Sequence, residues 1–194
     1  MIKLSSPTST PTVQLKYLSK RDVPTFFKLL KENKERLKYW LPWVKYTQKL
    51  TDVRNYVEEA QHRFTQGRAV FMGIWVENQL VGNINLQPID LQHKKAGIGY
   101  WLDRAHTGQG IMYQAAQQII QYGFQKLYLN RLEIACAAEN ERSRAVPQRL
   151  GFQQEGILRA FQIIDDAPVD VILYSLLYDE WKKQALTQNL TAEN

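Results

Sequence analysis

The residues best suited to bind a ligand lie in one short stretch, His106-Thr107-Gly108-Gln109-Gly110-Ile111-Met112, between a strand-like and a helix-like segment. Glycine has no Cβ, so Gly108 and Gly110 let the backbone bend sharply and approach a ligand closely. The N–H groups at the start of the following helix have no partner within the helix, and together with the helix dipole they attract anions. The stretch therefore predicts a cradle for a diphosphate, with a plain glycine turn as the alternative. His106 is either a phosphate contact or an exposed loop residue.

Other ligand-binding motifs do not fit the chain. A dinucleotide fingerprint would need a third glycine where Tyr113 stands, and a P-loop would need a Gly-Lys-Ser/Thr sequence. Three scattered histidines, His62, His93 and His106, with the single cysteine Cys136, do not make a metal cluster. The sequence therefore predicts no metal cofactor.

The segments around the cradle predict a strand, two helices, several meander strands, and then helix and strand twice. This order indicates an α+β domain with a mixed sheet. The expected strands are residues 12–18, 70–76, 80–86, 97–102, 132–137, 152–164 and 169–177, with a polar connection over 90–95. The expected helices are residues 22–37, 51–66 (with Thr51-Asp52 as its cap), 110–127, 140–150 and 179–186.

The bulk properties describe an ordinary soluble domain. The chain has 194 residues, 44% of them apolar, which fits a single domain over 12–188 with a loose lead-in at 1–11 and a tail at 189–194. No apolar run approaches the roughly 20 residues of a membrane span. One cysteine fits a reducing cytoplasm. The net charge of +6 suits an anionic ligand or an acidic partner such as a nucleotide cofactor or a ribosome, or is simply a solubility device.

Three blocks of residues occur in a fixed order along the chain. The first is GYWLD (99–103) with GQGIM (108–112). The second is LNRLE (129–133), ENERS (139–143), RLGF (149–152) and EG (155–156), and the third is VDV (169–171), YSL (174–176) and EW (180–181). Together they resemble the GNAT superfamily of N-acetyltransferases, in particular the RimJ/RimL branch, which acetylates N-terminal amines of ribosomal proteins. The resemblance spans residues 12–181.

This resemblance implies the GNAT fold, whose mostly antiparallel sheet splays between its fourth and fifth strands, and acetyl-CoA as the co-substrate in the gap. The end of the fourth strand would pair with pantetheine and hold the acetyl carbonyl, and the glycine loop would hold the pyrophosphate. The start of the helix expected over 140–150 would face the pantetheine arm and the sulfur. The implied cofactor-binding residues are Tyr100, Trp101, Leu102, Thr107, Gly108, Gln109, Gly110, Ile111, Met112, Asn140 and Ser143.

Thr107 and Met112 depart from the superfamily pattern. Thr107 stands where Arg or Gln is usual, which removes a side-chain donor and leaves the backbone cradle intact. Met112 stands where Gly or Ala is usual, and methionine there is typical of the RimJ/RimL branch.

The general-acid tyrosine of many superfamily members is replaced here by Pro147. Proline has no N–H, so the carbonyl of Ser143, four residues earlier, loses its helical partner. Ser143 is then the best candidate to protonate the departing CoA thiolate, and its alternative role is to cap the helix.

A general base is harder to find, because Ala96 and Gly97 occupy the region of the fourth strand where family members often carry an acid. An α-amine with a pKa of about 8 is roughly one-tenth neutral at pH 7, whereas a lysine amine at about 10.4 is neutral to well under 0.1%. The missing base therefore favours an N-terminal amine as acceptor. Glu133 or Asp170 could act through water, although surface ion pairing is the more common role of such residues.

Three further residues have two interpretations each. Trp40 and Trp43 flank Pro42 and either line the acceptor groove or pack over the helix pair. Cys136 in a strand is predicted to be a small buried core residue rather than a nucleophile, because no histidine lies near it in sequence.

The sequence thus predicts direct acetyl transfer, in a ternary complex, to the N-terminal amine of a protein. One rival function is acetylation of a polyamine or an aminoglycoside. Another is a catalytically weak RNA- or ribosome-binding module, although the dispersed lysines predict no direct nucleic-acid readout. The protein is expected to be a monomer or homodimer without a membrane partner.

Overall fold

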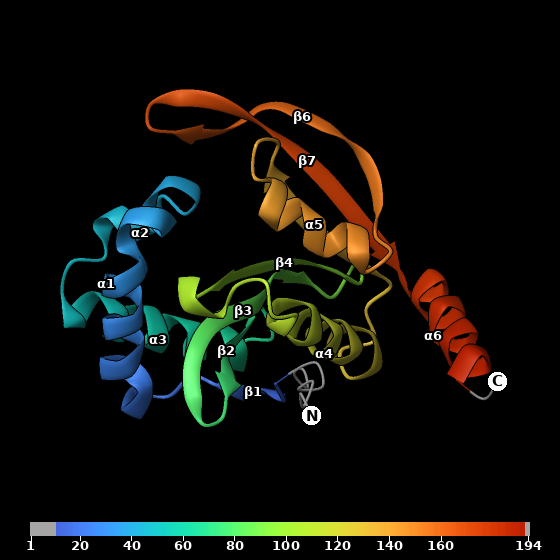
Figure 1. Cartoon of the computed structure of the whole chain (residues 1–194), viewed down its shortest axis with the longest axis horizontal. Coiled ribbons are helices and arrows are strands. Elements are labelled where there is room, and N and C mark those ends of the chain that lie inside the picture. Colours follow the sequence, from blue (N-terminus) through green and yellow to red (C-terminus); the bar gives the residue numbers. More distant parts are fainter. Residues whose placement is uncertain (1–10, 193–194) are drawn as a thin grey trace, which may run out of the picture.

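A mixed sheet crosses the molecule in the order β1-β2-β3-β4-β5-β7-β6 (Figure 1). The computed structural model describes residues 11–192, so most of the predicted lead-in and the last residues of the predicted tail lie outside it. Every neighbouring pair is antiparallel except β4 and β5, which confirms the predicted α+β fold with a mostly antiparallel sheet. The strands are β1 (Val13–Tyr17), β2 (Val70–Val76), β3 (Gln79–Asp90), β4 (Lys95–Leu102), β5 (Arg131–Ala137), β6 (Gln153–Ile164) and β7 (Ala167–Leu177).

The parallel pairing of β4 and β5 is short. Lys95, Ala96 and Gly97 align with Arg131, Leu132 and Glu133, and the pairing ends there. From Ile98 onward β4 keeps its antiparallel partner β3, while the rest of β5 stays paired with β7. The two halves of the sheet therefore diverge at this point, which confirms the predicted splay.

The helices cover the two halves of the sheet separately. In Figure 1, α1, α2 and α3 gather at one side of the β1–β4 half, α4 lies on the other side, and α5 sits between β4 and the arch of β6 and β7. The helices are α1 (Val23–Trp40), α2 (Trp43–Tyr46), α3 (Leu50–Thr65), α4 (Ile111–Gln125), α5 (Glu141–Arg149) and α6 (Tyr178–Ala192), with 3₁₀ turns η1 (Lys20–Asp22) and η2 (Arg104–His106).

Apolar residues at helical spacing form the core on each face. On α4, Ile111, Ala115, Ile119 and Ile120 are all buried against the strands. On the other face, α1 and α3 pack against β3 and β4, and Phe26 of α1 lies against the Trp101 ring with centroids 5.6 Å apart. Both faces of β4 are therefore packed against helices, through Ala96, Ile98 and Leu102 on one face and Trp101 on the other.

Several element boundaries differ from the predictions. Helix α3 is capped by Lys49 rather than Thr51-Asp52, because the Asp52 carboxylate reaches back to accept the N–H groups of Gln48 and Lys49, each at 2.8 Å. Strand β3 continues to Asp90, so the expected polar connection is shorter. Helix α6 continues to Ala192, into the predicted tail, instead of ending near Leu186.

The packing of α4 makes a stability prediction. Ile119 is fully buried, and Ile119→Ala should lower the free energy of unfolding by roughly 2–5 kcal/mol, because the lost contacts leave a cavity. Urea denaturation followed by circular dichroism measures the change. The matched control is Ile163→Ala on β6, whose side chain is 59% exposed and should cost far less. Equal losses for both variants would contradict this account of the core.

Candidate active site

The glycine stretch forms an open turn directly before α4. Gly108 and Gly110 have φ angles of +79° and +75°, in the left-handed region that favours glycine. Gly110 is the N-cap of α4 and makes no side-chain cap, and the first turn of the helix carries no acidic residue. Within the described residues, the N–H groups from Gly108 to Met112 have no protein acceptor. The geometry is that of an anion cradle made of backbone donors.

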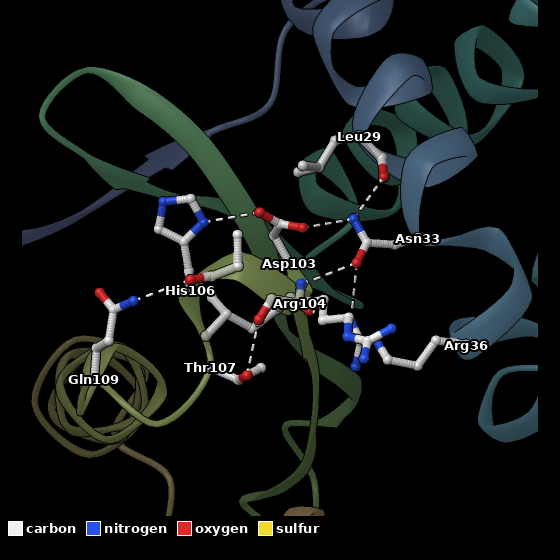
Figure 2. Close-up of polar contacts among 10 residues, drawn as sticks. Leu29, Asn33, Arg36, Asp103, Arg104, His106, Thr107 and Gln109 are labelled. Atoms are coloured by element: carbon white, nitrogen blue, oxygen red, sulfur yellow. Dashed lines mark hydrogen bonds and ion pairs between the residues drawn. The ribbon is translucent and has the colours of Figure 1, made fainter.

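A polar network ties this turn to α1 (Figure 2). The Asp103 carboxylate accepts hydrogen bonds from Asn33 Nδ2 and His106 Nδ1, each at 2.8 Å. Asn33 Oδ1 in turn accepts the backbone N–H of Arg104 at 2.9 Å, and the Arg36 guanidinium donates to the Leu102 carbonyl. Because Asn33 is 96% buried within the packed helix, it anchors the entry to the cradle. His106 is bound to Asp103 and only partly exposed, so it is not the free loop residue that was one of its two predicted states.

Two side chains of the cradle fold back on the preceding turn. Thr107 Oγ1 donates to the Arg104 carbonyl at 2.9 Å, and Gln109 Nε2 donates to the Ala105 carbonyl at 3.0 Å. Both side chains stabilise η2 (Figure 2). The donors that remain for a ligand are therefore those of the backbone, which explains how Thr107 can replace the usual Arg or Gln.

The hydrogen bonds also set the charge of Asp103. Partial burial favours its neutral form, but the hydrogen bonds from Asn33 and His106 outweigh burial and hold the pKa of the carboxyl below its usual value. Asp103 is thus ionised at neutral pH and keeps both of its partners in place.

Three protic groups meet where the sheet splays. The Tyr100 hydroxyl donates to the Ser143 carbonyl at 2.8 Å, which is the acceptor that Pro147 leaves without a helical partner. Ser143 Oγ lies 3.3 Å from the Tyr100 hydroxyl and 3.2 Å from Cys136 Sγ. The Tyr100 side chain of β4 therefore supplies the hydrogen bond that Pro147 cannot give to the start of α5.

The same cluster resolves two alternatives. Asn140 Oδ1 accepts the N–H of Ser143 at 3.2 Å, so Asn140 rather than Ser143 caps α5, and the Ser143 hydroxyl stays available. Cys136 is buried as predicted, and burial raises the pKa of its thiol, so it remains protonated. Burial likewise raises the pKa of Tyr100, so all three groups of the cluster are neutral.

The two predicted base residues already have partners. Glu133 Oε1 accepts from Arg131 Nε at 2.6 Å, and Asp170 Oδ1 accepts the Ala160 N–H at 2.8 Å. Arg131 also binds Glu155, and this bond lowers the pKa of the Glu155 carboxyl to about 2. The role of Glu133 and Asp170 as bases remains a prediction. Each also has a structural role, in the bond to Arg131 and to the Ala160 N–H respectively.

A cavity of about 240 Å³ lies between β3 and β4 on one side and helices α2 and α3 on the other. Trp43 lines it and stacks on Tyr56 with ring centroids 5.4 Å apart, whereas Trp40 packs edge-on against Tyr39 and is not part of the lining. The lining residues are Leu41, Trp43, Tyr56, Glu59, Ala60, Arg63, Phe71, Asn83, Asn85, Gln87, Gly99, Tyr100 and Trp101. The cavity thus reaches β4 at the start of the splay.

Sequence reasoning overlooked the polar residues of this lining. Asn83, Asn85 and Gln87 alternate with Ile84 and Leu86 in β3, and a period of two places the three polar residues on one face of the sheet. That pattern was visible in the sequence. Glu59 on α3 had no comparable signal, because it is one of many charged residues on an amphipathic helix.

A second cavity, of about 340 Å³, lies between α4, the end of α5 and α6. None of the predicted site residues lines it. No group of three or more His, Cys, Asp or Glu side chains in residues 11–192 could hold a metal ion, and no helix over that range is long and apolar enough to cross a membrane.

Comparisons with known proteins agree with this geometry. The family model described as an acetyltransferase (GNAT) domain matches residues 13–153. This chain belongs to the GNAT acetyltransferase family. The ribosomal-protein-serine acetyltransferase of Escherichia coli (strain K12) is 34% identical over 168 residues, which cover 87% of this chain and 94% of that protein.

Two similar solved structures contain coenzyme A or acetyl-CoA. The ribosomal L7/L12 alpha-N-protein acetyltransferase RimL has a TM-score of 0.85 and 29% identity, covers 90% of this chain and 98% of that one, and holds coenzyme A in a disulfide with a cysteine. The microcin C7 self-immunity acetyltransferase MccE, in complex with acetyl-CoA and AMP, has a TM-score of 0.82 and 26% identity, with 85% and 92% covered.

The protein is therefore an acetyl-CoA-dependent N-acyltransferase of the GNAT family. The residues present fit the co-substrate, because unpaired backbone donors at a helix start suit a diphosphate, and the gap between β4 and β5 leaves strand edges free for a polar arm.

Replacement of a cradle glycine should weaken acetyl-CoA binding. An alanine at Gly110 must keep a left-handed backbone, at roughly 1–2 kcal/mol, or move the donors. We expect Gly110→Ala to raise the Kd for acetyl-CoA in calorimetry by about tenfold. Gly156→Ala is the control, because Gly156 is not among the glycines with positive φ and an added Cβ there meets nothing within 4 Å. Unchanged binding by Gly110→Ala would show that the cradle does not hold the phosphates.

The hydrogen bonds from Asn33 and His106 to the Asp103 carboxylate should make the free energy of unfolding decrease at acid pH. A carboxyl whose pKa is lowered on folding contributes stability above its unfolded pKa of about 3.9 and loses it as pH falls through the folded value. The thermal midpoint of the wild type should therefore drop more between pH 6 and pH 3 than that of Asp103→Asn. Asp166→Asn, in an exposed turn, should keep the wild-type drop. Parallel curves for wild type and Asp103→Asn would rule out this contribution.

Proposed function

We propose that the protein acetylates the α-amine at the N-terminus of a ribosomal protein, by direct transfer in a ternary complex. Relatives named for this reaction cover nearly the whole chain, and they favour it over both a small-molecule acetyltransferase and an RNA-binding module. The observation that carries the proposal is the lack of a carboxylate on β4 near the splay. An added Cβ at Gly97 would lie 2.7 Å from the Gln87 carbonyl oxygen, so this position is closed to an acidic side chain.

The missing carboxylate selects the acceptor through the pKa of its amine. About one-tenth of an α-amine with a pKa near 8 is neutral at pH 7, whereas a lysine side chain is almost wholly protonated. An enzyme without a strong base for its acceptor can therefore acetylate an α-amine, but it barely acetylates a lysine side chain. Glu133 and Asp170 remain the proposed routes by which water could carry the proton away.

Residues around the splay would support each step. The amine nitrogen forms a bond to the acetyl carbon while the bond from that carbon to sulfur breaks. Backbone N–H groups of β4 beyond Gly97, free of β5, would stabilise the oxygen of the acetyl carbonyl. The Ser143 hydroxyl, which donates to the Tyr100 hydroxyl at 3.3 Å, would give its proton to the sulfur as the thiolate leaves. Water that has taken up the amine proton would return a proton to Ser143.

The remaining cofactor contacts follow the same arrangement. Tyr100, Trp101 and Leu102 would offer their backbone to the pantetheine arm, Asn140 would fix the start of α5 beside it, and the cradle from Thr107 to Met112 would hold the pyrophosphate. Trp43 would contact the acceptor, whereas Trp40 lies outside the cavity lining and packs against Tyr39.

The net charge of +6 suits acidic or ribosome-bound acceptors. A cytoplasmic location agrees with this function and with the single cysteine. Recognition would then rest on the protein acceptor and not on nucleic-acid bases, by an enzyme that is a monomer or a homodimer.

The function is tested by thiol release from acetyl-CoA with a panel of acceptors. Peptides with free Ser or Ala N-termini should drive CoA release, whereas the same peptides with a blocked N-terminus and an internal lysine should not. Mass spectrometry should place the acetyl group on the α-amine. Faster turnover of polyamines than of peptides would keep the enzyme class and overturn the proposed acceptor.

Ser143→Ala tests the proton donor. Removal of a general acid lowers kcat by roughly 100-fold or more, and we expect that loss with a nearly unchanged Kd for acetyl-CoA. Steady-state kinetics and calorimetry measure the two quantities. Cys136→Ala removes a neighbouring group of the same cluster and should cause a much smaller loss, because Cys136 carries no proton in the proposed step. Similar losses in both variants would assign the effect to packing.

A further inference from the structure

The cavity beside β3 and β4 holds a buried polar atom that the fold leaves unpaired. Asn85 is 8% exposed, and its Oδ1 has no hydrogen-bond partner among the described residues. Two positions earlier on the same face, Asn83 Nδ2 donates to the Met72 carbonyl at 2.9 Å. Asn83 therefore has a structural role. Buried polar atoms in folded proteins are almost always paired, so Asn85 Oδ1 requires another explanation.

The space over this amide is kept open by a glycine. Asn85 pairs with Gly99 across β3 and β4, and a Cβ at Gly99 would lie 3.0 Å from Asn85 Oδ1. Both residues line the cavity. The next residue along β4 is Tyr100, whose hydroxyl is bound at Ser143 in the splay. The unpaired oxygen thus belongs to a residue that lines the cavity beside β3 and β4, and its cross-strand partner Gly99 directly precedes Tyr100.

A second residue of the lining carries a buried, unpaired hydrogen-bond donor. Trp101 lines the cavity, is 6% exposed, and has no partner for its Nε1–H among residues 11–192. An N-terminal residue carries an amine that donates and a carbonyl that accepts a few bonds apart, so it complements this pair of groups. A polyamine offers only donors. The volume of about 240 Å³ is below the roughly 300–1,000 Å³ of pockets that hold drug-sized ligands, so it fits an end of a chain better than an aminoglycoside.

Building on the proposed function, we propose that Asn85 is the residue that reads the acceptor amine: its Oδ1 accepts an N–H of the terminal α-amine and orients the nitrogen lone pair toward the splay. Trp101 Nε1 donates to the first carbonyl of the same acceptor. A neutral amide is suited to this task, because a carboxylate at this position would stabilise the ammonium form and raise the pKa of the amine. The charged side chains that line the same cavity are Glu59 and Arg63 of α3, which are of opposite sign.

Two substitutions separate this role from a structural one. Asn85→Ala removes the acceptor atom, so KM for a free N-terminal peptide should rise about tenfold or more with the Kd for acetyl-CoA unchanged. Asn85→Asp keeps an acceptor oxygen and adds charge. Its KM should stay near the wild-type value, while the pH of half-maximal kcat should rise by about one unit or more. A purely structural asparagine would not produce that shift.

Controls keep the outcomes distinct. Asn55→Ala makes the same change on the exposed face of α3 and should leave KM unchanged, and thermal melting shows whether each variant folds. If the wild type acetylates peptides but Asn85→Ala changes KM by less than about twofold and Asn85→Asp leaves the pH profile in place, the assignment of Asn85 is wrong. If the wild type acetylates only polyamines, the proposed function fails; Asn85 is then retained as the amine-reading residue only if Asn85→Ala still raises KM for that amine tenfold.

Discussion

The hydrogen-bond ladder between β4 and β5 ends after three aligned residue pairs, and the geometry of the site depends on that interruption. Up to Gly97 and Glu133 the strands hold each other, and beyond them each keeps only its outer partner. Strand edges buried in the middle of a sheet must satisfy their backbone groups in some other way. A ligand with alternating amide groups, such as a pantetheine arm, can supply the missing partners. The unpaired edges of β4 and β5 beyond these three pairs are therefore the part of the sheet that suits such a ligand.

The opening remains usable because both sides of it are anchored. On the β4 side, Asn33 of α1 binds Asp103 and Arg104 and so fixes the turn that leads into the cradle. On the β5 side, Tyr100 reaches across to the Ser143 carbonyl at the start of α5. Pro147 has no N–H to donate to this carbonyl, so the Tyr100 hydroxyl supplies a hydrogen bond that the helix does not. This bond connects β4 to the start of α5 across the splay.

The sequence predicted those parts of the molecule that follow from local rules. Helix faces, the glycine cradle, the buried Cys136 and the freed carbonyl of Ser143 depend on spacing, missing Cβ atoms or a missing N–H, all of which are local properties. The partner of that carbonyl, Tyr100, is 43 residues away in sequence and no local rule names it. The same holds for the Asn33–Asp103 bond, which joins residues 70 apart in sequence. The cap of α3 is a local capping box, in which Asp52 bonds back to the Lys49 N–H, and it was missed although a local rule describes it. The cradle could be predicted, but its anchors could not.

The lack of an acidic side chain on β4 and the neutral amide of Asn85 on the facing strand are consistent with one another, and the charged residues of the cavity lining, Glu59 and Arg63, lie on α3. A carboxylate beside the amine would attract the ammonium form, and its own charge would then oppose the loss of the proton that the reaction requires. Gly97 is closed to an acid by the Gln87 carbonyl, and Asn85, which lines the cavity, ends in a neutral amide. Under the proposed function, such a site depends on the neutral fraction that the acceptor brings. That dependence would disfavour lysine side chains through their pKa, and the ionisation of the acceptor would then contribute to specificity without any steric barrier.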